Sequence, residues 1–213
     1  HKHPAKEWPT LDRVHFESFK VDTRIKPVQA FSALIAGKSY NLLRFFNQDF
    51  YNELKRKISN SNYDIIHFES LFSLIYAPLL RNFTNAPMVY RTHNVEYVLW
   101  EEKAKKCRNP LKKFYLKTLA TQLKREEKTL SLSADGVLCV SNTDLPYYQK
   151  IGVRNIMTML PVIPVHPVQE PMQNTFFHLG AMDWEPNLEG VQWLLDKVWP
   201  KVLEKTPEAK LHL

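Results

Sequence analysis

Short apolar runs bounded by polar residues alternate, along most of this sequence, with stretches that repeat apolar positions at helical spacing. The apolar runs predict strands at residues 64–68, 87–90, 137–140 and 155–160. The helical spacing predicts helices at residues 27–36, 41–59, 71–81, 95–100, 110–132 and 145–151. This alternation is typical of an α/β fold with a Rossmann-like parallel sheet, in a doubly wound arrangement with right-handed crossovers.

A proline-rich break follows the last of these strands. Four of the 14 prolines stand within eleven positions, at Pro161, Pro164, Pro167 and Pro171. Such a segment is typical of a semi-rigid linker between domains. We therefore expect one domain over residues 1–160, a linker over 161–174 and the start of a second domain over 175–213.

The stretch after the linker has the pattern of a second, incomplete βαβ unit. A strand is predicted at 175–179, a helix at 188–199 and another strand at 209–213. Pro200 is expected to kink or end the helix, because proline lacks the N–H that a helix interior uses. The first residue is not methionine and nothing follows the last strand, so we expect a fragment of a longer protein.

Composition favours a cytoplasmic protein. No run approaches the ~20 apolar residues of a membrane-spanning helix. The first residues lack the apolar core of a signal peptide. Cys139 lies in an apolar run and is expected in the core, whereas Cys107 lies among lysines, so the two do not suggest a disulfide framework. We expect a cytoplasmic location, with peripheral attachment to the inner face of the membrane as a further expectation from the charge pattern.

The net charge of +7 is concentrated in one region. Residues 103–128 hold ten lysines and arginines against two glutamates, so the rest of the chain is close to neutral. The lysines expected to face outward are Lys105, Lys106, Lys112, Lys113, Lys117 and Lys124, while apolar positions from Leu111 to Leu130 are expected to pack inward. The structural interpretation is a solvated helix face, with Glu126 and Glu127 as charge balance. The functional one is an anionic membrane surface, to which each nearby Lys or Arg contributes about 1 kcal/mol.

Polar residues follow the ends of three predicted strands. They are Glu69 after the first strand, Arg91, His93, Asn94 and Glu96 after the second, and Ser141 after the third. The carboxyl ends of parallel strands meet at one edge of a sheet, where ligands bind in open α/β folds. Arginine binds phosphate or carboxylate, and histidine and glutamate bind sugar hydroxyls or move protons. The structural interpretation is an ordinary strand-to-helix turn capped by Asn94.

A second candidate site is the loop from Gly180 to the helix predicted to begin near Asn187. Glycine lets a ligand approach the backbone, and the unpaired N–H groups of a helix N-terminus suit a phosphate. A plain connection capped by Asn187 is the alternative. The histidines lack helical metal-ligand spacing, so we expect no metal. The chain has neither a nucleophile elbow nor a phosphate-binding loop ending in Gly-Lys-Ser/Thr.

Three motifs, in order across the proline-rich segment, resemble those of the group 1 glycosyltransferases, which form family four and have the GT-B fold. The motifs are Arg91-Thr92-His93-Asn94-Val95-Glu96 with Trp100, Ala134-Asp135-Gly136-Val137 leading to Val140-Ser141, and the run from Gly180 to Val191. The resemblance covers residues 60–213, and the residues before them are compatible with it.

The resemblance implies two Rossmann-like domains, the first binding the acceptor and the second a nucleotide-sugar. It implies transfer to a saccharide or lipid-linked acceptor, with retained anomeric configuration and without a metal or other cofactor, in cell-surface polysaccharide synthesis. It further implies that the basic helix meets the anionic membrane. The donor-holding residues of the second domain are missing after Leu213, so the fragment alone is expected to be inactive.

The resemblance also implies roles for the candidate residues. His93 would correspond to the histidine that contacts the transferred sugar and would be catalytic. Residues implied on the acceptor side are Glu69, Arg91, Asn94, Glu96 and Ser141. Residues implied near the donor pyrophosphate are Gly180, Asp183, Asn187 and Gly190.

The sequence is also compatible with two other functions. One is a sugar-nucleotide epimerase of the same fold, which would turn over a nucleotide-sugar without any acceptor. The other is a non-enzymatic basic module that docks on a membrane or nucleic acid through residues 103–128. Steeply salt-dependent DNA binding would favour nucleic acid, which the leading hypothesis does not include as a partner.

Overall fold

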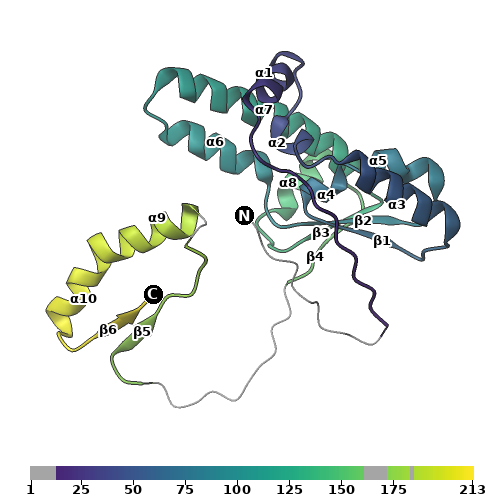
Figure 1. Cartoon of the computed structure of the whole chain (residues 1–213). Helices are drawn as coiled ribbons and strands as arrows, with labels where there is room; N and C mark the ends of the chain where they lie inside the picture. Colours follow the sequence, from purple (N-terminus) through teal and green to yellow (C-terminus); the bar gives the residue numbers. More distant parts are fainter. Residues whose placement is uncertain (1–12, 161–171, 183–184) are drawn as a thin grey trace. The chain divides into compact units, whose positions relative to one another are not determined.

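The computed structural model describes residues 13–160, 172–182 and 185–213 (Figure 1). The chain divides into two compact units, His1–Pro161 and Val162–Leu213. The division falls at the start of the predicted linker, and residues 161–171 of that linker lie outside the described part.

The first unit is built on a parallel sheet of β1 (Ile66–Glu69), β2 (Met88–Thr92), β3 (Gly136–Cys139) and β4 (Ile156–Thr158), in that spatial order. The α/β fold class and the order of strands and helices are therefore as predicted. A doubly wound sheet reverses its strand order at one point. The four strands described here do not reverse, and right-handed crossovers then bring the connecting helices over one face, as Figure 1 shows.

The first unit also contains the helices that pack around this sheet. They are α1 (Pro27–Ile35), α2 (Tyr40–Leu43), α3 (Gln48–Asn60), α4 (Leu71–Leu74), α5 (Ala77–Leu80), the 3₁₀ turn η1 (Arg81–Phe83), α6 (Glu96–Lys106), α7 (Pro110–Ser133) and α8 (Leu145–Ile151). Helix α8 ends as predicted at Gly152, whose φ of 101° is left-handed and suits glycine. Of the helices described, none is both long and apolar enough to cross a bilayer.

Two predicted helices are broken in the structure. The helix expected at 41–59 is α2 and α3, because the Asn47 side chain accepts a hydrogen bond from the Phe50 N–H (2.8 Å) and begins a new helix. The Tyr76 hydroxyl holds this break: it accepts from the Asn47 N–H and donates to the Phe45 carbonyl. The helix expected at 71–81 becomes α4, α5 and η1, with Pro78 in the first turn of α5.

The core lies between the sheet and α7. Phe68, Met88, Tyr90, Val137 and Cys139 point from the sheet toward the helices and are buried, so Cys139 is a core thiol as expected. Helix α7 packs through Leu116, Leu119 and Leu123, as its spacing predicts. Leu111 was expected to pack with them, but it is 82% exposed because it lies in the first turn of α7, at the tip of the α6–α7 hairpin.

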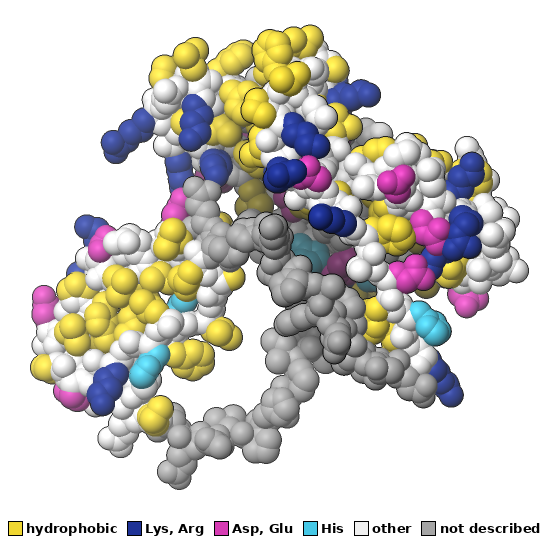
Figure 2. Space-filling model, viewed as in Figure 1, with side chains coloured by type: hydrophobic (Ala, Val, Ile, Leu, Met, Phe, Trp, Pro, Cys, Tyr) yellow, Lys and Arg dark blue, Asp and Glu magenta, His cyan; other side chains and the backbone are white. Residues whose placement is uncertain are grey.

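The outer side of α1, α6 and α7 exposes apolar and basic side chains together (Figure 2). Phe114 on α7 is 74% exposed, and Phe31 and Ile35 on α1 are also exposed. Lysines of α6 and α7 lie among them, mostly exposed. The basic helix face is therefore an outer surface that carries apolar side chains as well.

The second unit contains a parallel pair, β5 (Thr175–Phe177) and β6 (Lys210–His212), joined by a long helical segment. That segment is α9 (Glu185–Trp193), a π-helical turn η2 (Leu194–Val198) and α10 (Trp199–Lys205). The predicted βαβ unit is present. Pro200 does not end the helix, since it lies in the first turn of α10, after the π turn.

Candidate functional site

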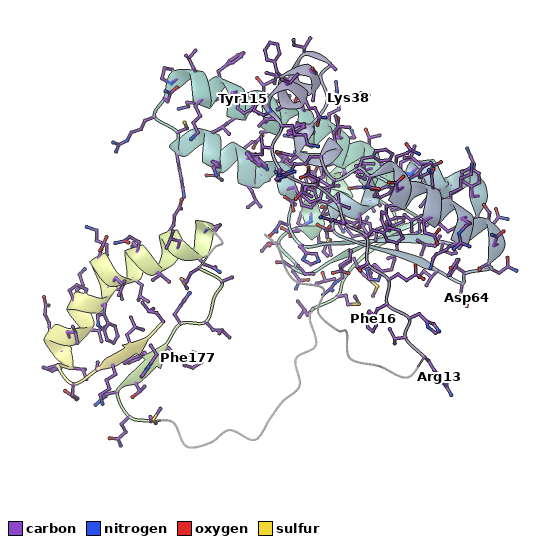
Figure 3. The ribbon with its side chains drawn as sticks, viewed as in Figure 1. Arg13, Phe16, Lys38, Asp64, Tyr115 and Phe177 are labelled. Atoms are coloured by element: carbon purple, nitrogen blue, oxygen red, sulfur yellow. The ribbon has the colours of Figure 1, made fainter. Side chains whose placement is uncertain are left out.

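Glu69, Arg91 and His93 form one cluster at the carboxyl edge of the sheet. Glu69 and Arg91 are paired in the register of β1 and β2, and Arg91 Nη1 donates to Glu69 Oε1 at 2.9 Å. His93 Nε2 lies 2.6 Å from the same oxygen. Asp64, labelled in Figure 3 before the start of β1, marks the opposite edge. The sequence thus predicted correctly that residues of separate strand ends meet here.

Arg91 belongs to the strand rather than to the loop after it. The strand was predicted to end at Tyr90, but β2 continues to Thr92 with buried and partly buried residues alternating. Arg91 therefore points to the face opposite Tyr90 and Thr92, where it meets Glu69. Its position on a paired strand makes this ion pair a fixed part of the site.

The Glu69 carboxylate is ionised and sets the orientation of His93. Partial burial raises the pKa of Glu69, but the hydrogen bond from His93 and the charges of Arg91, His93 and His67 outweigh it, so the pKa lies below the ordinary value. A carboxylate can only accept, so His93 carries a proton on Nε2. In the neutral imidazole the lone pair is then on Nδ1, which can accept from a hydroxyl.

The turn between β1 and α4 is strained beside this cluster. Ser70 has φ 84° and ψ 158°, a region that only glycine occupies easily. Its N–H donates to the Arg91 carbonyl at 3.1 Å, and its carbonyl accepts from the Ser73 hydroxyl. Such strain persists only where surrounding contacts impose it, so the backbone after Glu69 is held firmly.

The start of α6 is capped by a residue distant in sequence. Asn94 was expected to cap this helix, but Val95 is the N-cap residue and makes no side-chain cap. Instead, Glu127 of α7 accepts from the N–H groups of Glu96 and Tyr97, each at 3.0 Å. Glu127 has 0% exposure, so its interpretation as surface charge balance was wrong.

Glu127 is the residue of this site that sequence reasoning missed. A signal for it was present, since it follows Leu123 by four positions and therefore lies on the buried side of α7. Glu126, the other supposed counter-charge, is half-buried and accepts from the Ser39 N–H at 2.9 Å. Through these contacts, Glu127 joins the start of α6 to α7 and Glu126 joins the start of α2 to α7.

The remaining first-unit candidates are nearby in the fold but not joined to the cluster by a hydrogen bond among the described residues. The Asn94 carbonyl accepts from Thr92 Oγ1 at 2.8 Å. Glu96 is partly buried, which raises its pKa. Ser141, after β3, accepts from the Thr143 N–H within its own turn.

The second-unit candidates lie around the loop before α9. Asp183 lies outside the described residues. The helix begins at Glu185, so Asn187 is in its first turn rather than at its cap, and its side chain donates to the Ala181 carbonyl at 3.1 Å. A Cβ at Gly180 would come within 2.9 Å of the Asn187 and His178 side chains, so this loop is tightly packed. Gly190 has open space around its Cα.

No group of three or more His, Cys, Asp or Glu is arranged for a metal ion anywhere in the described ranges. The cluster itself consists of a carboxylate, a guanidinium and an imidazole at one sheet edge. Such groups bind hydroxyls and anionic oxygens, and the imidazole can transfer a proton.

Burial raises the pKa of Glu127 to about 7, chiefly because the carboxylate is removed from water. The folded protein therefore binds a proton more tightly than the unfolded chain, and stability from this group is lost as the pH rises through about 7. The free energy of unfolding of the natural chain relative to Glu127→Gln should fall between about pH 5 and pH 8, by up to about 3 kcal/mol. Denaturant unfolding of both proteins across this range measures it, and a pH-independent difference would contradict the burial argument.

Residues 17–164 match the family model described as Glycosyltransferase Family 4. The matched range begins well before residue 60, where the sequence resemblance began, and ends before the motif at 180–191. A Klebsiella pneumoniae protein, "Uncharacterized 44.6 kDa protein in cps region", is 27% identical over 164 residues, which is 72% of this chain and 39% of that protein. The chain thus spans less than half the length of this relative.

Proposed function

The chain belongs to glycosyltransferase family 4, and from this premise we propose that the whole protein transfers a sugar from a nucleotide-sugar to a saccharide or lipid-linked acceptor. The observation that carries the proposal is the Glu69–Arg91–His93 cluster, within the matched range and at the edge where open α/β sheets bind ligands. Since the matched part of this chain covers 39% of its relative, the activity is proposed for the whole protein.

We propose that transfer retains the anomeric configuration. The bond from the sugar's anomeric carbon to the phosphate oxygen of the nucleotide breaks, and its electron pair leaves with the nucleotide. A bond from that carbon to an acceptor oxygen forms, and the proton of the acceptor hydroxyl passes to the departing phosphate. His93 is the proposed catalytic residue, its Nδ1 accepting from a hydroxyl of the transferred sugar while Glu69 holds Nε2. Arg91, Asn94, Glu96 and Ser141 are proposed acceptor-side residues.

The second unit is proposed to begin the nucleotide-sugar domain. The unit begins with a βαβ motif in which Gly180 precedes the N-terminus of a helix. A helix N-terminus of this kind can bind a pyrophosphate. Asp183, Asn187 and Gly190 are proposed to lie near the donor. No metal or cofactor is part of this proposal.

We propose that the protein binds its acceptor at a membrane surface. The proposed role is in cell-surface polysaccharide synthesis. We define the hairpin surface as Leu111 and Phe114 with Lys105, Lys106, Lys112, Lys113, Lys117 and Lys124. Exposed apolar side chains surrounded by lysines suit the interface of an anionic bilayer. Lys105 pairs with Glu102 and Lys124 lies near Glu101, so Lys112, Lys113 and Lys117 carry more of the attraction.

The test is a transfer assay with the whole protein, a panel of labelled nucleotide-sugars and membrane lipid extract. Label should enter a lipid or saccharide product, with the donor's anomeric configuration kept, and only when acceptor is present. Conversion of the nucleotide-sugar without acceptor would instead identify an epimerase. Residues 1–213 alone should show no turnover, and turnover by them would contradict the proposed need for a complete donor domain.

A further inference from the structure

We propose that Glu127 is a positioning residue, whose buried side chain, together with Tyr148 and Thr92, fixes the loop that carries His93. The inference rests on the function proposed above for His93. It concerns a residue of α7 that is distant in sequence from the motif around His93.

Glu127 holds the first turn of α6 in place. Both oxygens of Glu127 are used, Oε1 by the Glu96 N–H and Oε2 by the Tyr97 N–H, each at 3.0 Å. The first N–H groups of a helix have no partner within it, and buried ones are costly when unpaired. Glu127 therefore fixes where α6 begins, three residues after His93.

Two hydroxyl groups extend from Glu127 to the residues on either side of His93. The Tyr148 hydroxyl of α8 lies 2.8 Å from Thr92 Oγ1 and 3.2 Å from Glu127 Oε1, and its single hydrogen is donated to one of these two oxygens at a time. Thr92 Oγ1 in turn donates to the Asn94 carbonyl at 2.8 Å. Thr92, Tyr148 and Glu127 are all fully buried, so water does not compete for these contacts.

The contacts made by Glu127 and by the two hydroxyls hold the residues on both sides of His93. Thr92 precedes it and Asn94 follows it, and both are held by the hydroxyls, while the helix start after them is held by the carboxylate. The imidazole itself is held by Glu69. A buried network with discrete geometry transmits a small change at one member to the others, so loss of the Glu127 contacts should displace the His93 ring.

Two substitutions interrupt the network at different points, and one neighbour gives a matched control. Glu127→Gln leaves a single oxygen to accept from two N–H groups, and Tyr148→Phe removes the bridging hydroxyl but keeps the ring. Glu126→Gln changes the adjacent carboxylate of the same helix, which accepts from the Ser39 N–H instead. The control removes a carboxylate charge from the same helix and leaves Glu127, Tyr148 and Thr92 in place.

The experiment uses the whole protein labelled with ¹³C in histidine. Glu127→Gln and Tyr148→Phe should each shift the His93 ring signal, and hydrogen exchange of the segment 94–98 should quicken at least about tenfold. Glu126→Gln should leave both unchanged. If Glu127→Gln and Tyr148→Phe leave the His93 signal and this exchange as they are in the natural protein, the proposal is wrong.

Transfer assays then distinguish a role of Glu127 in positioning His93 from a role in the stability of the fold alone. Glu127→Gln should lower kcat about 10- to 100-fold, because small displacements of a catalytic group have effects of that size, with the KM for the donor little changed. Combined with His93→Ala it should lower kcat no further, since both changes remove the same contribution. Additive losses would overturn the proposal. If His93→Ala itself has no effect, the proposed function fails while the ring-signal measurement still decides the role of Glu127.

Discussion

Replacing His93 by alanine in the whole protein should lower the rate of sugar transfer about 100- to 1,000-fold, the range typical of removing one preorganised hydrogen-bonding group from an active site. Its imidazole is the proposed contact to the transferred sugar, held by Glu69 at 2.6 Å. The KM for the donor should change little, because the donor is proposed to bind mainly to the second domain. Initial rates at varied donor concentration measure both quantities.

The matched control for this prediction is His15→Ala. His15 is an exposed histidine of the first unit, distant in sequence from the cluster, so its removal should leave the rate within about twofold, as surface changes usually do. Glu69→Gln should fall between the two, because the amide can still contact Nε2 but no longer carries the charge that orients it. Full activity of the His93→Ala protein would contradict the proposal that His93 is catalytic.

Replacing Lys112, Lys113 and Lys117 together by glutamine should weaken binding to anionic vesicles roughly 100-fold, since each lysine near such a surface contributes about 1 kcal/mol. Changing Leu111 and Phe114 to serine should weaken it further, because their exposed side chains are proposed to enter the interface. Co-sedimentation with phosphatidylglycerol-containing vesicles, at two salt concentrations, measures the binding.

Three lysines of the second unit, Lys197, Lys201 and Lys205, supply the control. They are exposed and carry the same charge, but they lie outside the hairpin surface, so their replacement should leave vesicle binding nearly unchanged. Equal losses from both sets would indicate a general charge effect. Duplex DNA should bind weakly, and steeply salt-dependent DNA affinity without vesicle binding would contradict the membrane proposal.

The sheet and the central cluster could be predicted because they follow from local patterns and chain order. Four apolar runs separated by helical stretches leave a parallel sheet as the natural arrangement, and parallel strands bring their carboxyl ends together. Glu69, Arg91 and His93 were therefore expected at one edge, and register places Glu69 directly beside Arg91. The roles assigned to these residues remain proposals.

The contacts that hold the loop could not be predicted, because each joins residues distant in sequence. Asn94 is of a residue type that often caps helices, yet Glu127 makes the cap from 31 positions away. The helix at 41–59 has unbroken periodicity, yet the Tyr76 hydroxyl holds a break at Asn47. Helical spacing identifies the buried side of α7, but only the fold shows which N–H groups that side meets.

A crystal structure of the whole protein with an unreactive nucleotide-sugar analogue tests the proposed contact between His93 and the transferred sugar. We expect a hydroxyl of the sugar within about 3.2 Å of a nitrogen of the His93 ring, with the Glu69–His93 contact preserved. A sugar bound away from the carboxyl edge of β1 and β2, with His93 in contact with solvent alone, would contradict it.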